Sequence, residues 1–308
     1  MTRQVVRTAA TVLGTALLGA TLVPGPADAA ARSTATVAGG CGLSAGSITA
    51  GGDHRIQKVS SAPPAASTPI VGPQNLFPDG QAWLAGTLES TPVASGGEAR
   101  REYVVIGYEM FATSYRTDAS GTGLYPGSFS KTKIGGGWYR GGARYFEESK
   151  YSDSGYQRTN TYGLFGDHIR RWTIDSGWRD YTFYEGFDAV KTMVLISQTR
   201  TYDTFLANLK SGSLYTIRIP TGPGAPVVTK VRAATWQVFE TMIAEKCGSQ
   251  STLLLGIDQD TKAGYLYAVS HADGAATVIK GLGKVPTTFP DTTYFRYRTK
   301  GSGNLFGE

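Results

Sequence analysis

The sequence lacks most of the residues and motifs that would indicate a metalloenzyme, a nucleotide-binding protein or a helical protein. Its 308 residues include three histidines, four methionines and two cysteines. The histidines, His54, His168 and His271, are scattered and stand beside no group of carboxylates at metal-ligand spacing, so we expect no metal site and no cofactor. G-x-S-x-G, H-E-x-x-H and Walker motifs are absent, and no long stretch has helical periodicity.

The excess of positive over negative charge is also small. Thirty Lys and Arg residues face 24 Asp and Glu residues, for a net charge of +6. The basic residues are dispersed, so nucleic acid is not an expected partner. A mildly basic chain is attracted to anionic polymers or to an acidic protein partner.

The first 29 residues have the pattern of a secretory signal peptide. Arg3 and Arg7 precede an apolar run over 9–23, and Ala27-Asp28-Ala29 is typical of a cleavage site. The run is too short to cross a membrane comfortably, so we expect secretion to the extracellular space without membrane insertion. Residues 30–40 are small and polar and predict a flexible tail, followed by one domain over 41–308.

The two cysteines, Cys41 and Cys247, are 206 positions apart in the sequence. In an exported protein two cysteines permit one disulfide, and the pairing is unambiguous. Two buried free thiols are the alternative. The disulfide interpretation requires a fold that returns residue 247 to the start of the domain.

Short apolar and aromatic pairs recur after turn residues along the whole chain. Their spacing, about 39 to 52 residues, is typical of β-propeller blades, each of which contains four strands. We aligned the repeats on one residue of each pair, namely Trp83, Leu124, Leu164, Leu214, Leu266 and Leu305. The pattern predicts an all-β single propeller, with six blades favoured and five as the alternative.

The two ends of the domain complement each other in this alignment. Residues 305–308 match residues 164–167 at the start of one unit, and residues 52–59 match residues 166–173 of the same unit. A blade assembled from both termini closes the ring and removes an exposed sheet edge. We therefore predict a ring closed by a blade shared between the N- and C-termini.

Gly-x-Leu-Tyr turns such as 264–267, together with the Gly-Trp turns that end at Trp138 and Trp178, resemble the repeats of tachylectin-type β-propeller lectins. In that family each blade carries the pattern and N-acetylated sugars bind between neighbouring blades. The resemblance implies a glycan or cell-wall polymer as partner, with Trp138 and Trp178 at the sugar sites.

Five tryptophans and seventeen tyrosines also suit carbohydrate binding, because sugar C–H faces pack on aromatic rings. A tryptophan repeated in each unit can equally be a wedge between blades. For Trp83 and Trp172 we favour the wedge. Trp138, Trp178 and Trp236 follow turns, and we predict them as ligand-binding residues while the wedge interpretation stays open.

The sequence thus predicts a secreted, lectin-like carbohydrate-binding protein that is not an enzyme. The first alternative is a protein-interaction module, an extracellular signal or a subunit of a larger secreted assembly. The second is a propeller glycosidase with carboxylates near the ring axis. The densest acidic group available for it contains Glu147, Glu148, Asp175, Glu185 and Asp188.

Overall fold

A computed structural model describes residues 40–174, 177–178 and 181–308. The predicted signal peptide and nearly all of the predicted tail therefore lie outside the described residues. Within them, the regular structure is almost entirely antiparallel β-sheet, with one short 3-10 helix at Gly274–Ala276. No described helix has the length and apolar character needed to cross a membrane.

Three antiparallel sheets of four strands each follow one another in the middle of the chain. Their strands pair in sequence order, as in successive hairpins. The sheets contain β10 (Ala143–Asp153), β11 (Tyr156–Phe165), β12 (His168–Thr173) and β13 (Tyr181–Glu185); β14 (Val190–Gln198), β15 (Tyr202–Leu209), β16 (Leu214–Pro220) and β17 (Val227–Arg232); and β18 (Thr241–Cys247), β19 (Ser251–Asp258), β20 (Ala263–Val269) and β21 (Ile279–Thr288).

A ten-stranded sheet joins the two ends of the domain. Its terminal half contains β1 (Gly42–Ile48), β2 (His54–Ser61), β3 (Pro64–Ala66), β4 (Ile70–Val71) and β22 (Thr293–Thr299). Its second half contains β5 (Ala82–Ala85), β6 (Leu88–Pro92), β7 (Glu98–Ile106), β8 (Glu109–Arg116) and β9 (Ser130–Gly136). Strand β22 pairs antiparallel with β1 and parallel with β6, so the last strand of the chain lies between these two early strands.

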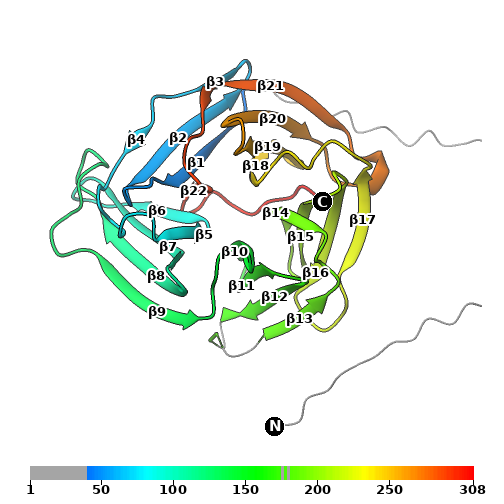
Figure 1. Cartoon of the computed structure of the whole chain (residues 1–308), viewed down its shortest axis with the longest axis horizontal. Coiled ribbons are helices and arrows are strands. Elements are labelled where there is room, and N and C mark those ends of the chain that lie inside the picture. The colour runs from blue at the N-terminus through cyan, green and yellow to red at the C-terminus, as the bar shows by residue number, and fades with distance from the viewer. Residues whose placement is uncertain (1–39, 175–176, 179–180) are drawn as a thin grey trace, which may run out of the picture. The chain divides into compact units, whose positions relative to one another are not determined.

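The sheets are arranged around a common axis, and each four-stranded sheet and each half of the ten-stranded sheet has an inner strand near the centre (Figure 1). Contacts between these inner strands run in a cycle: β5 contacts β10, β10 contacts β14, and β14 contacts β18. Strand β18 contacts β22, and β22 contacts β5. Every inner strand therefore has a neighbour on both sides.

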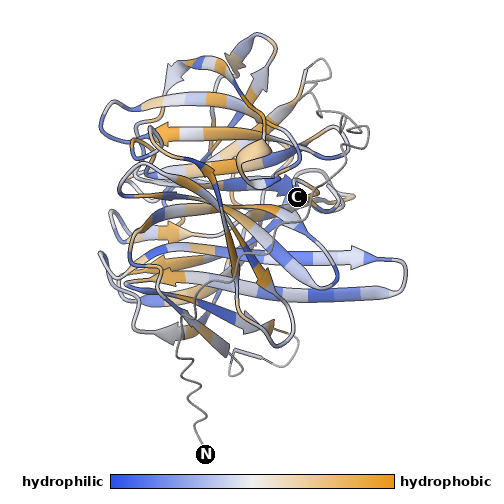
Figure 2. Ribbon diagram, turned by 90° about the vertical axis from the view of Figure 1, so that its right-hand side faces the viewer, coloured by the Kyte–Doolittle hydropathy of each residue, from blue (hydrophilic) through white to orange (hydrophobic). Residues whose placement is uncertain are grey.

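Five hydrophobic cores lie between neighbouring sheets or sheet halves and pack them together. Alternation along the strands explains them, because successive side chains of a strand point to opposite faces. On β14, Met193 and Leu195 pack toward the β10–β13 sheet, whereas Val194 and Ile196 pack toward the β18–β21 sheet. Figure 2 shows the hydrophobic stretches along the strands that result.

The end of the chain crosses from one sheet to the next after leaving β22. Asn304 exchanges two hydrogen bonds with the backbone of Ser152, and Leu305 does the same with Gln198 through backbone and side chain. Gly307 donates to Ile196 and accepts from Ala272. This segment, residues 304–308, therefore connects all three four-stranded sheets.

The apolar stretches 101–113, 191–197 and 253–257 lie in β7 with β8, in β14 and in β19. The repeat alignment was wrong in its register. Leu164 lies on the second strand of its sheet and Leu214 and Leu266 lie on third strands, whereas Leu305 belongs to the crossing segment. A glycine before a leucine and an aromatic residue marks different positions: Leu214 follows a turn, whereas Gly163 and Leu164 lie within β11.

The predicted disulfide is present. Cys41 and Cys247 are bonded, with their Cα atoms 5.6 Å apart, and they link the start of β1 to the end of β18. The sulfur atoms lie at the core between the terminal half and the β18–β21 sheet. The bridge thus holds together two sheets that are far apart in sequence.

Replacing both cysteines by alanine should lower the free energy of unfolding by about 2–5 kcal/mol, because the disulfide restricts a long loop in the unfolded chain. Urea unfolding of the double variant and of the oxidised and reduced wild type measures this. We expect the double variant to match the reduced protein. Equal unfolding midpoints for the variant and the oxidised protein would show that the bridge does not stabilise the fold.

Candidate functional site

A cavity of ≈ 340 Å³ lies where the inner strands begin, and we call it the axial cavity. Residues from or beside β5, β10, β14, β18 and β22 all line it. The charged and polar ones are Arg140, Arg144, Glu147, Lys191, Thr192, Glu240, Gln259 and Thr293, and Trp83 and Tyr294 are among its aromatic residues. Side chains from every sheet thus meet at one end of the axis.

Glu147 on β10 is buried in this cavity, with 8% of its surface exposed. Its Oε1 accepts hydrogen bonds from the backbone N–H of Glu148 at 2.9 Å and of Thr87 at 3.4 Å. Burial raises the pKa of Glu147, while the bond from Thr87 and the charge of Arg296 lower it in part. Burial therefore makes this carboxyl group easier to protonate than an exposed glutamate.

Glu240, which precedes β18, is the second carboxylate of the axial cavity. Its Oε1 forms an ion pair with Lys191 Nζ, which also donates to the carbonyl of Gln237. Its Oε2 accepts from the backbone N–H of Gln259 at 2.8 Å. Two carboxyl groups of different surroundings thus line one cavity, an arrangement that suits proton transfer.

Further along β10, Glu148 belongs to a compact ionic cluster. It pairs with Arg101 at 2.6 Å and with Lys150 at 2.8 Å, and Lys150 also pairs with Glu89 at 2.5 Å. Burial raises the pKa of Glu148 to about 7, with Arg101 lowering it and the charge of Glu89 raising it. All of these partners are protein side chains, which is typical of a structural cluster.

A second cavity, of ≈ 400 Å³, lies between β9 and the β10–β13 sheet, and we call it the aromatic cavity. Trp138, Tyr139, Phe165, His168, Arg170, Trp172, Trp178 and residues 134–137 line it. The rings of Trp138 and Trp172 stack with centroids 6.2 Å apart. Tyr139 is 58% exposed at its edge.

Arg170 is the cationic group of the aromatic cavity. Its guanidinium lies 4.4 Å from the ring centroid of Phe183 and 4.9 Å from that of Tyr181. Burial lowers the pKa of Arg170, although not enough to neutralise an arginine. The cavity therefore offers aromatic faces together with one fixed hydrogen-bond donor.

Trp138 and Trp178 both line the aromatic cavity beside Trp172, and Trp138 is only 6% exposed and also packs in the core between β5–β9 and the β10–β13 sheet. Trp236, predicted as a third ligand-binding residue, is only 5% exposed and packs in the core between the β14–β17 and β18–β21 sheets. Trp172, for which we favoured a wedge, is buried and also lines the cavity. Trp83 lines the axial cavity, a placement that the repeat pattern does not predict.

The acidic residues singled out from the sequence do not gather in one place. Glu147 lines the axial cavity and Glu148 lies in the ionic cluster, whereas Glu185 and Asp188 are exposed. Asp175 lies outside the described residues. The lining residues Glu240, Arg140 and Arg144 were missed because no sequence motif connects them with Glu147.

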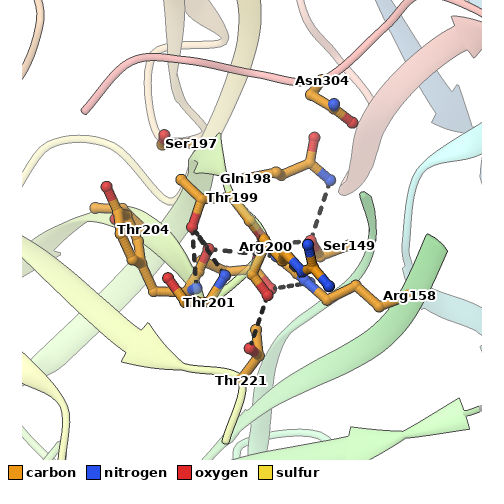
Figure 3. A network of polar contacts seen from close by, with 12 residues as sticks. Ser149, Arg158, Ser197, Gln198, Thr199, Arg200, Thr201, Thr204, Thr221 and Asn304 are labelled. Carbon is orange, nitrogen blue, oxygen red and sulfur yellow. Dashed lines mark hydrogen bonds and ion pairs between the residues drawn. The ribbon is translucent and has the colours of Figure 1, made fainter. Parts of the chain in front are cut away.

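A buried polar network joins the β10–β13 and β14–β17 sheets (Figure 3). At its centre is Asp203 on β15, whose carboxylate accepts hydrogen bonds from Ser149 Oγ, Tyr162 Oη and both terminal nitrogens of Arg158 at 2.7–2.8 Å. Gln198 donates to Ser149 Oγ and accepts from the backbone of Leu305. The network fixes the sheets and the crossing segment rather than presenting groups to a ligand.

Comparisons with known proteins give little beyond this geometry. No family model and no curated protein matches the chain. Fifteen chains of solved structures match it, among them an alpha-L-arabinofuranosidase from Podospora anserina in complex with cellotriose. That structure has a TM-score of 0.45 and 12% sequence identity, and the match covers 77% of this chain and 78% of that chain. The resemblance to tachylectin-type lectins is not tested by these comparisons and stays a prediction.

The prediction that the protein is not an enzyme is corrected here. The matching Podospora anserina structure is that of an enzyme. Glu147 and Glu240 line one cavity near the axis, where the glycosidase alternative places its carboxylates. The sequence does not show this, because the two residues are 93 positions apart and reach the cavity from β10 and from the residue before β18.

Replacing Asp203 by alanine leaves the buried guanidinium of Arg158 without its counter-ion and should lower the free energy of unfolding by about 3–5 kcal/mol. The exposed Asp260, for which alanine should change stability by less than about 0.5 kcal/mol, is the matched control. Chemical denaturation measures both variants, and similar small losses would contradict the central role of the network.

Proposed function

We propose that this protein is a secreted β-propeller that binds carbohydrate, and that its glycan-binding surface is the aromatic cavity. The observation that carries the proposal is the gathering of Trp138, Trp172 and Trp178 with Tyr139 and Arg170 around one cavity. Aromatic faces accept the C–H face of a sugar ring, and a guanidinium and exposed backbone groups bind its hydroxyls.

The propeller in this proposal has five blades. Five cores between neighbouring sheets and the cycle of contacts among five inner strands support that number. The pairing of β22 with β1 supports closure by one blade shared between the two ends of the domain. Six blades, which we favoured from the sequence, would need a further unit.

Secretion and a partner on cell surfaces complete the proposal. The Cys41–Cys247 disulfide suits an oxidising compartment, as does the signal-peptide pattern of the first 29 residues. The resemblance to tachylectin-type lectins favours N-acetylated glycans or cell-wall polysaccharides as ligands. If the partner is a protein instead of a glycan, it would contact the exposed aromatic rings at the edge of the aromatic cavity.

Replacing Trp178 or Tyr139 by alanine should weaken binding of a glycan selected on an array by about tenfold or more, because an aromatic contact surface is lost. Titration calorimetry of folded variants measures the change. Tyr108, which is 73% exposed and does not line the cavity, is the matched control for Tyr139. Glycan binding that survives in both cavity variants would place the sugar site elsewhere.

A second candidate function is glycoside cleavage at the axial cavity, because Glu147 and Glu240 line it together. Glu147, buried and with a raised pKa, is suited to protonate the departing oxygen. Glu240, held by Lys191 and by the backbone of Gln259, would act as the carboxylate on the opposite side.

If the protein cleaves glycosides, Glu147→Gln should lower kcat by about 10²–10⁴-fold, because the amide cannot donate the proton. Activity of the wild type should fall as pH rises through the raised pKa of Glu147, because the carboxyl group then loses the proton that it must donate. Nitrophenyl glycosides and polysaccharides assayed for reducing ends test this, with the exposed Glu185→Gln as control. Activity that is equal in Glu147→Gln and the wild type would exclude this role.

A further inference from the structure

The charges that line the axial cavity are not balanced. Its cationic residues are Arg140, Arg144 and Lys191, and its acidic residues are Glu147 and Glu240. Lys191 and Glu240 form an ion pair with each other. No ion pair among the described residues involves Arg140 or Arg144, so these two guanidinium groups lack an acidic partner in the cavity.

Arg140 is held in position without being neutralised. Its Nη2 donates to the carbonyl of Gly80 at 2.9 Å, and its guanidinium lies 5.4 Å from the ring centroid of Trp83. The indole is fixed in turn by a hydrogen bond from its Nε1 to the carbonyl of Gly107 at 2.8 Å. Among the described residues, no ion pair and no hydrogen bond involves Nε or Nη1 of Arg140.

Arg144, like Arg140, is held by hydrogen bonds to backbone carbonyl groups. Its Nη2 donates to the carbonyls of Gly166 at 2.7 Å and Phe187 at 3.5 Å, both neutral groups. The pKa of Arg144 is lowered by burial, and Asp188 acts in the opposite direction without forming an ion pair among the described residues. Two guanidinium groups four residues apart thus border one cavity while bonding to backbone oxygens.

We infer that the axial cavity binds the carboxylate of an acidic sugar, through Arg140 and Arg144. The planar fork of a guanidinium matches a carboxylate and can bind it through two parallel hydrogen bonds. In its protonated form Glu147, which lines the same cavity, can donate a hydrogen bond to that carboxylate or to a neighbouring hydroxyl. The volume, ≈ 340 Å³, lies in the range of small-ligand sites.

The turn before β10 connects this site to the aromatic cavity. Trp138 and Tyr139 line the aromatic cavity, and the next two residues, Arg140 and Gly141, line the axial cavity. Gly141 has φ +84°, a conformation that favours glycine and reverses the chain between the two. The inference rests on the proposed function and names its ligand class: a uronate-containing oligosaccharide that contacts both cavities.

Titration calorimetry with trimers of galacturonate and glucuronate, with their methyl esters and with the monomers, tests the inference on the full-length protein. We expect the wild type to bind at least one acidic trimer, and its methyl ester about tenfold or more weakly. Arg140→Gln should weaken binding of both trimer and monomer. Lys280→Gln, which removes an exposed positive charge outside the cavity, should change neither.

The variants also separate this inference from the proposed function. Trp178→Ala should weaken binding of the trimer and leave binding of the monomer unchanged, because only the longer ligand reaches the aromatic cavity. If the ester binds as well as the acid, or if Arg140→Gln binds the acid like the wild type, the axial carboxylate site is wrong. Loss of trimer binding in Trp178→Ala would then still support glycan binding at the aromatic cavity. Absence of binding to every acidic sugar would overturn the inference, and the ester comparison does not depend on any variant being folded.

Discussion

Two-sided burial of the sheets is the constraint on which the rest of this structure depends. Each inner strand sends alternate side chains into two different cores, as Met193 and Val194 of β14 do. A sheet that is apolar on both faces needs a neighbour on each side, and the series of neighbours ends only when the last sheet meets the first. The insertion of β22 between β1 and β6 and the disulfide from β1 to β18 both act at that junction.

The same constraint decides where polar groups can lie. Apolar side chains occupy most of the space between sheets, and several charged residues of the inner strands lie at the axial cavity. Where they meet partners they form closed clusters, such as Glu148 with Arg101 and Lys150. Buried charges are tolerated there because each is paired and hydrogen-bonded. The axial cavity differs, since Arg140 and Arg144 are held by neutral carbonyl groups.

The fold class was predictable because strand alternation and turn residues are local signals. The disulfide followed from there being only two cysteines. The register of the repeats was not predictable, because a leucine near a glycine occurs within a second strand, on third strands and, at Leu305, in the crossing segment. Trp236 shows the same limit: like Trp138 it follows a turn and packs in a core, but only Trp138 also lines the aromatic cavity.

The candidate sites show that the sequence identifies site residues when they belong to a short local motif. Trp138 and Trp178 were identified from the Gly-Trp turns, and the β10–β13 sheet brings them to one cavity. Glu147 and Glu240 stand in different repeats, and only the cyclic order of the inner strands brings both to one cavity. A turn of six residues, 137–142, links the two kinds of site, because its first half contributes aromatic rings to one cavity and its second half a guanidinium to the other. A ligand that is partly apolar and partly anionic satisfies both halves at once, whereas a neutral sugar leaves the cationic half without a partner.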